Sequence, residues 1–148
     1  MTRQGFTLIE LLVVLVVLAI LAAFAVNKVN SVKETAYVTT MKADLRNLVL
    51  AEEAYFQDSS AYAKKVSCGK KVSSGSAIFC TSAGNTLGTI TVVKAKVPNK
   101  KGKGGKEAAW TASIASAHTG KRCAIYVGDV TPAAPATTSD PPGVPVCQ

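Results

Sequence analysis

The stretch GFTLIELLVVLVVLAILAAFAV, residues 5–26, decides how this chain folds, and it holds a single charged residue, Glu10. As an α-helix, residues 6–26 would reach about 31 Å at about 1.5 Å per residue, close to the thickness of the hydrocarbon core of a bilayer. We therefore expect a membrane-spanning helix. Because Arg3 and the amino terminus are the only positive groups before it, the first residues should stay cytoplasmic and the rest should be exported.

Glu10 stands near the cytoplasmic end of this helix, where a buried ionised carboxylate is costly. Insertion scales assign about 2.5–3.5 kcal/mol to a charge at the centre of a bilayer, and less near its surface. Cleavage of the chain after Gly5 would create a new α-amino group on Phe6, about one helical turn from Glu10. The same amine on a neighbouring chain could neutralise this carboxylate. The pair would then set how subunits stack.

Residues 5–10, GFTLIE, behind a short basic leader resemble the class III signal of type IV prepilins and pseudopilins. The resemblance implies that a membrane aspartic peptidase, the prepilin peptidase, cleaves between Gly5 and Phe6, and that the new amino group of Phe6 is methylated. It also implies that the subunit leaves the bacterial inner membrane and polymerises, with a pilus assembly platform, into an extracellular filament. In that filament Glu10 would match incoming subunits.

The physical chemistry of the helix agrees with this resemblance. A helix that is apolar on all sides must be buried on all sides. Lipid covers it in a bilayer, and only copies of itself can cover it in a filament. Glycine at position 5 leaves the backbone of the scissile bond unshielded by a side chain and free to extend.

Two other interpretations of the same stretch remain. An ordinary secretory signal peptide would be cut after the small-x-small pattern of Ala23, Phe24 and Ala25, but a carboxylate at the head of the apolar region and a single leader arginine argue against it. A plain single-pass anchor explains the length of the stretch. It does not explain the placement of Gly5 and Glu10.

The expected organisation is a leader at 1–5, a long helix at 6–58 with residues 6–26 as membrane span and filament core, and a globular head at 59–148. Proline is absent before Pro98 and glycine between Gly5 and Gly69, so strong helix breakers are missing from residues 6–58. Many type IVa pilins carry glycine and proline at the positions of Ala19 and Asn27. Without them we expect a continuous helix.

The second half of this helix has an apolar stripe at spacings of three and four, interrupted by Glu52. The stripe needs a partner surface, and the sheet that follows is the obvious one. Side chains on the other faces are expected in water. The stripe consists of Val38, Met41, Leu45, Leu48 and Tyr55, and the side chains expected in water are Lys42, Asp44, Arg46 and Glu53.

Strand patterns follow in the head, where β-branched or alternating residues occupy 89–97, 110–115 and 123–127. Residues 59–87 are rich in Ser, Gly, Lys and Ala and read as a connecting loop with a short strand at 77–80. The Pro-rich tail at 131–145 should lie extended across the head. We therefore predict an α+β pilin fold in which three or four antiparallel strands pack on one long helix.

The chain has four cysteines, all in the part expected to be exported, which suggests disulfides in an oxidising compartment. Four cysteines allow three connectivities. We pair Cys68 with Cys80 and Cys123 with Cys147, because both pairs are local in sequence and the second would hold the Pro-rich tail. The resemblance agrees, since many type IV pilins fasten the C-terminal segment with a disulfide. No metal site is expected, because the chain lacks a Cys-x-x-Cys spacing and has one histidine, His118.

A cluster of lysines, which begins in the strand expected at 89–97 and continues into the segment after it, could hold a polyanion, with DNA and an acidic polysaccharide as candidates. The alternative, which we favour, is a solvated hairpin tip that maintains solubility, because such charge runs are common and no aromatic residue is interleaved for base stacking. The cluster consists of Lys94, Lys96, Lys100, Lys101, Lys103 and Lys106.

The sequence favours a structural protein over an enzyme, because no serine stands in a recognisable catalytic setting and no Gly-rich phosphate loop follows a strand. No cofactor is expected. We interpret the chain as a structural subunit of a type IV pilus, with adhesion, twitching motility or DNA uptake as the filament's use. The alternative is a pseudopilin or a minor or competence pilin of a secretion or DNA-uptake machine.

Overall fold

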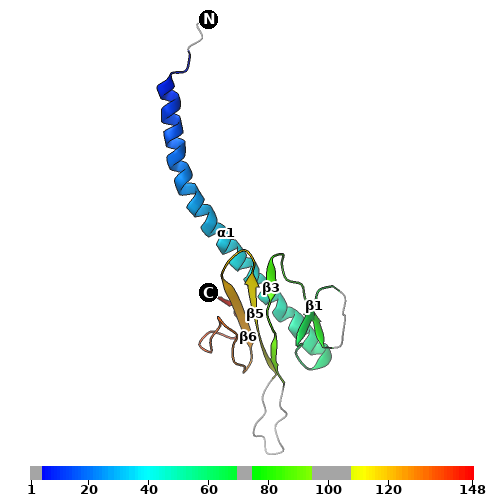
Figure 1. Ribbon diagram of the computed structural model, residues 1–148. Coiled ribbons are helices and arrows are strands. Elements are labelled where there is room, and N and C mark those ends of the chain that lie inside the picture. Colours follow the sequence, from blue (N-terminus) through cyan, green and yellow to red (C-terminus); the bar gives the residue numbers. More distant parts are fainter. Residues whose placement is uncertain (1–4, 70–74, 95–107) are drawn as a thin grey trace, which may run out of the picture. The chain divides into compact units, whose positions relative to one another are not determined.

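A single helix, α1 (Leu8–Ser59), dominates the computed structural model, which describes residues 5–69, 75–94 and 108–148 (Figure 1). The chain divides into two compact units, residues 1–35 and 36–148, and the division falls within α1. Helix is assigned at every residue from Ala19 to Asn27, so the expectation of a continuous helix there is confirmed. Absence of glycine and proline from this segment explains why it remains helical.

The first unit contains the apolar part of α1. Every side chain described between Leu8 and Ala25 is exposed, including those of Leu15 and Phe24. Among the described residues, α1 is long and apolar enough to cross a membrane, as judged by its length and composition. The first unit therefore leaves the apolar surface of this part of the helix uncovered, and burial of that surface requires lipid or another apolar partner.

The second unit is built around a five-stranded antiparallel sheet in which β5 is paired on both sides. One neighbour of β5 is β6, and β7 pairs with β6 in turn. On its other side β5 pairs with both β3 and β4, which follow one another along the same edge. The strands are β3 (Asn85–Leu87), β4 (Thr91–Val93), β5 (Ala109–Ser116), β6 (Arg122–Val127) and β7 (Val146–Cys147).

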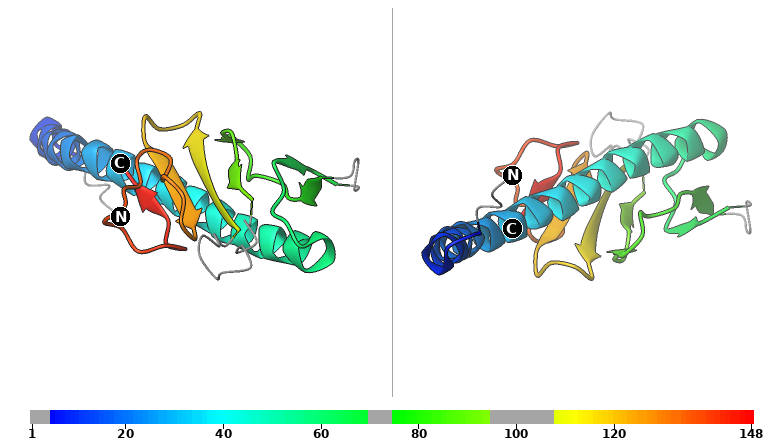
Figure 2. Two further views of the ribbon diagram at one scale, coloured as in Figure 1. Left: turned by 90° about the horizontal axis from the view of Figure 1, so that it is seen from below. Right: turned by 90° about the horizontal axis from the view of Figure 1, so that it is seen from above.

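A second, smaller sheet consists of β1 (Lys65–Ser67) and β2 (Ser76–Ile78), which run parallel. Figures 1 and 2 place it next to the edge of the larger sheet that carries β3. A disulfide between Cys68 and Cys80 joins the segments that follow these two strands. This disulfide stabilises two strands that are too short to be stable as an isolated pair.

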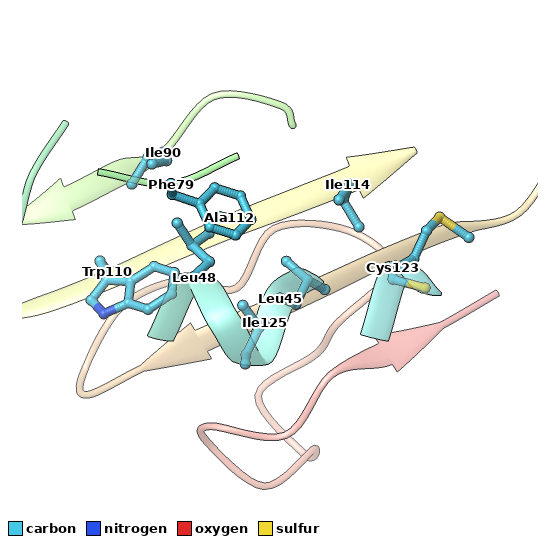
Figure 3. Close-up of a cluster of buried hydrophobic side chains, with 10 residues drawn as sticks. Leu45, Leu48, Phe79, Ile90, Trp110, Ala112, Ile114, Cys123 and Ile125 are labelled. Atoms are coloured by element: carbon cyan, nitrogen blue, oxygen red, sulfur yellow. The ribbon is translucent and has the colours of Figure 1, made fainter. Parts of the chain in front are cut away.

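The core lies between the larger sheet and the second half of α1 (Figure 3). Met41, Leu45 and Leu48 are fully buried there, as the spacing of the stripe predicted, and they pack with Trp110 and Ile125 of the sheet. The α+β class with one long helix on an antiparallel sheet is therefore confirmed.

The strand predictions were partly wrong. Residues 59–87 were expected as a loop with one short strand, but they contain β1, β2 and β3. The tail at 131–145 contains no helix or strand, as expected, but the residues directly after it form β7, which was not predicted and which pairs with β6 between Cys123 and Cys147. These strands have two or three residues each, which is too short for a hydrophobic alternation to be read from sequence.

The tail is held by packing as well as by β7. Ala136 is buried with Ala124 and Tyr126, and the partly buried Val130 and Ala133 pack against this cluster. The Tyr126 hydroxyl donates a hydrogen bond to the carbonyl of Asp140. The Pro-rich segment therefore has its own small apolar contact area on the outer part of the sheet.

Candidate functional site at the amino terminus

Thr7 and Glu10 form a capping box at the start of α1. The backbone N–H of Thr7 donates to Oε2 of Glu10 at 2.9 Å, and the Thr7 hydroxyl donates to the same oxygen at 2.8 Å. In return, the backbone N–H of Glu10 lies 3.4 Å from the Thr7 hydroxyl oxygen. This reciprocal arrangement satisfies donors that a helix start leaves without partners, and it fixes where α1 begins.

The sequence analysis missed this capping role of Glu10. A readable signal was present, because threonine followed three residues later by glutamate and then an apolar run is the pattern of a capping box. Of the two carboxylate oxygens of Glu10, only Oε2 accepts hydrogen bonds from the described residues, and the Glu10 side chain is exposed. The carboxylate therefore remains accessible to a further charged partner.

Gly5 and Phe6 precede the helix and are open to approach. Neither residue has regular structure, and the Phe6 side chain is 80% exposed. A Cβ atom placed on Gly5 would meet no other atom within 4 Å. The peptide bond between them thus lies in exposed chain just outside the capped helix.

The surface beyond the capping box is continuously apolar for nearly five turns of helix, at about 3.6 residues per turn. Its exposed side chains extend from Leu8 to Phe24 with no charged residue after Glu10. Such a surface is far larger than the apolar patches that a soluble monomer leaves in water. It requires lipid or other apolar helices around it.

Residues 1–26 match the family model described as the prokaryotic N-terminal methylation motif, which is the class III signal peptide of type IV pilin-like proteins. The motif indicates a type IV pilin-like or pseudopilin-like protein. In general it implies processing by a prepilin peptidase and polymerisation, and with the apolar helix it fits a precursor anchored in the membrane. No curated protein and no solved structure matches the chain.

The two disulfides of the structure join the same cysteines that were paired from the sequence. Cys68 bonds to Cys80 across 12 residues, and Cys123 bonds to Cys147 across 24. The second bond connects β6 to β7, so it fastens the C-terminal segment to the sheet. The first lies on the surface beside the smaller sheet.

The lysine cluster falls mostly outside the described residues. Lys94 is described and exposed, at the end of β4. Lys96, Lys100, Lys101, Lys103 and Lys106 lie outside the described residues. Within the described part of the chain, no group of three or more His, Cys, Asp or Glu side chains could hold a metal ion.

Asp44 was expected in water, and that expectation was wrong. Asp44 is 3% exposed and ties α1 to the segment between β2 and β3. Its carboxylate accepts from the Ser82 N–H at 2.9 Å, from the Ser82 hydroxyl at 2.7 Å and from the Asn85 amide at 2.8 Å. Three donors compensate the loss of water around this carboxylate, which is why burial is tolerated.

Glu52, which interrupts the apolar stripe, is fully buried. Its Oε2 accepts a hydrogen bond from the Ala63 N–H at 2.8 Å, while Oε1 has no partner among the described residues. Burial raises the pKa of the Glu52 carboxyl to about 7; the bond from Ala63 lowers that pKa, and the nearby charge of Glu53 raises it. Near neutral pH this carboxyl is therefore partly protonated.

Proposed function

We propose that this chain is a structural subunit of a type IV pilus, most plainly its major pilin, which polymerises through residues 6–26 into a filament on the cell surface. The observation that carries the proposal is the capped, exposed apolar helix that forms most of the segment matched by the methylation motif. A head held by two disulfides and a large sheet is suited to the outside of such a filament. The filament would serve adhesion, motility or DNA uptake.

In this proposal the prepilin peptidase cleaves between Gly5 and Phe6, and Phe6 becomes the methylated first residue. Its amino group then carries a positive charge, two residues before the first helical residue Leu8. The Glu10 carboxylate of a neighbouring subunit neutralises that charge when the helices bundle. This pairing removes two uncompensated charges from an apolar filament core, where each would be costly.

The dual role of Glu10 allows a sharp test, because glutamine can replace glutamate in a capping box but carries no charge. We expect Glu10→Gln and Glu10→Ala each to reduce the yield of sheared surface filaments about tenfold or more, with subunit retained in the membrane. Thr7→Ala, which removes the cap and leaves the charge, should reduce the yield much less. Immunoblots of sheared and membrane fractions measure both pools.

Filaments at wild-type yield from Glu10→Gln would refute charge matching. A sheared fraction that contains the chain only as a trace component would refute its role as the major subunit. Assembly by Glu10→Gln together with failure of Thr7→Ala would assign Glu10 to capping alone.

A further inference from the structure

A groove lies between the two sheets of the head, which are not paired with one another. This groove encloses about 520 Å³ and is lined by residues 64–66 on one side and residues 87–90 on the other. Lys64 directly precedes β1 and residues 65–66 begin it, whereas Leu87 ends β3 and residues 88–90 connect β3 to β4. The groove therefore lies between an edge of the smaller sheet and an edge of the larger one; Figure 2 shows the two sheets next to one another.

The β1 edge presents backbone groups on the side away from β2. The N–H of Phe79 donates to the carbonyl of Ser67 at 3.0 Å, so Ser67 points its backbone groups toward the β2 segment. Backbone groups alternate in direction along a strand, which turns the N–H and carbonyl of Val66 away from β2. Val66 lines the groove. Among the described residues, β1 pairs with no strand other than β2.

The β3 edge presents backbone groups in the same way. The Gly88 N–H donates to the Ser113 carbonyl at 2.7 Å, and the Ala117 N–H donates to the Gly84 carbonyl at 2.8 Å. Even-numbered residues of this segment thus bond to β5, and the backbone of Leu87 points to the opposite side. Leu87 also lines the groove. No described strand pairs with β3 on that side.

We propose that this groove binds an extended, acidic peptide segment of a partner protein, which pairs as an additional strand between β1 and β3. Unpaired strand edges are templates for such pairing, and here two edges face a single groove. The partly buried side chains of Val66 and Leu87, together with Ile90, offer apolar contacts for alternate side chains of the added strand. The added strand joins the two sheets into one.

Charge determines which occupant fits. Lys64 and Lys65 are exposed at one wall of the groove, and none of the described residues that line it is acidic. The whole chain carries a net charge of +8. A second copy of the same edge would bring lysines against lysines, which is how natural edge strands avoid pairing with themselves. An acidic segment instead complements the groove and is drawn to it electrostatically.

The test uses the full chain in non-ionic detergent micelles and a dye-labelled peptide, acetyl-Glu-Val-Glu-Val-Glu-Val-amide. Fluorescence anisotropy should show saturable binding, and hydrogen exchange should show new protection of the Val66 and Leu87 amides. The double variant Lys64→Glu/Lys65→Glu should weaken binding about tenfold, the effect of losing two exposed ion pairs. The charge-matched control Lys121→Glu/Arg122→Glu should leave affinity within about twofold of wild type.

Two further probes separate strand pairing from simple charge attraction. The same peptide with N-methyl groups on alternate amides keeps its charges but cannot bond to both edges, so it should not bind. Single-stranded oligodeoxythymidine offers charge without a peptide backbone. Equal binding of either probe would overturn the proposal in favour of a polyanion surface. Absence of saturable peptide binding, or equal loss in the control variant, would also overturn it.

Discussion

Replacement of Glu52 by glutamine should remove most of the pH dependence that this residue gives to the stability of the head. Burial is the largest cause of the raised pKa of Glu52, about 7 in the folded protein against an ordinary 4.5. Between these two pH values the folded state binds a proton that the unfolded state has released. Stability from this group is therefore complete below pH 4.5 and is lost as the pH rises through about 7.

The shift corresponds to about 3 kcal/mol, since one pKa unit is worth about 1.4 kcal/mol. In the Glu52→Gln variant the oxygen that accepts from Ala63 can be kept, while the ionisation is gone. The buried amide group changes the level of stability at every pH, so the slope with pH rather than the level is the informative quantity. The difference in unfolding free energy between variant and wild type should move by about 3 kcal/mol in favour of the variant from pH 4.5 to pH 8.

Urea unfolding of the full chain in detergent measures this difference. Trp110 is the only tryptophan of the chain and is fully buried in the head, so its fluorescence reports the transition. The control Glu53→Gln removes the neighbouring charge and should keep most of the slope, because burial outweighs that charge. A difference between Glu52→Gln and wild type that stays constant across the pH range would refute the reasoning.

Two further substitutions test what joins the head together. Asp44→Ala should lower the unfolding free energy by about 2–4 kcal/mol, because it leaves buried donors of Ser82 and Asn85 without an acceptor. The control Asp58→Ala, at an exposed position, should change the unfolding free energy by about 0.5 kcal/mol or less. Equal effects of the two substitutions in urea unfolding would contradict this prediction. Removal of the second disulfide by Cys147→Ala with Cys123→Ala should lower the unfolding free energy by about 3 kcal/mol and speed amide exchange in β7, and unchanged exchange there would show that packing alone holds the strand.

Much of the long helix was predictable because its signals are local. Composition and the absence of breakers predicted a continuous helix, and spacings of three and four identified Met41, Leu45 and Leu48 as core. The longest strands, β5 and β6, were predicted for the same reason, since each has enough residues to show a pattern. The antiparallel connection between them followed from the short turn near Gly120.

The remaining features depend on partners that are distant in sequence. Burial of Asp44 is possible because Ser82 and Asn85, which are 38 and 41 residues away in sequence, supply hydrogen-bond donors. The local sequence around Asp44 does not predict these donors. Three-residue strands such as β1 and β3 are defined by their pairing rather than by their own composition. The capping role of Glu10 could have been predicted from its local sequence. It was missed because the sequence analysis assigned this carboxylate to charge matching between subunits alone.

Mass spectrometry of the chain produced in cells that contain a prepilin peptidase tests the central claim most directly. The proposal predicts a mature protein that begins at Phe6, lacks residues 1–5 and carries one methyl group on its α-amino nitrogen. A mature chain that begins at Val26, after removal of the whole apolar stretch, would contradict the account, because no helix would remain for a filament core. A chain that keeps Met1 would contradict it equally.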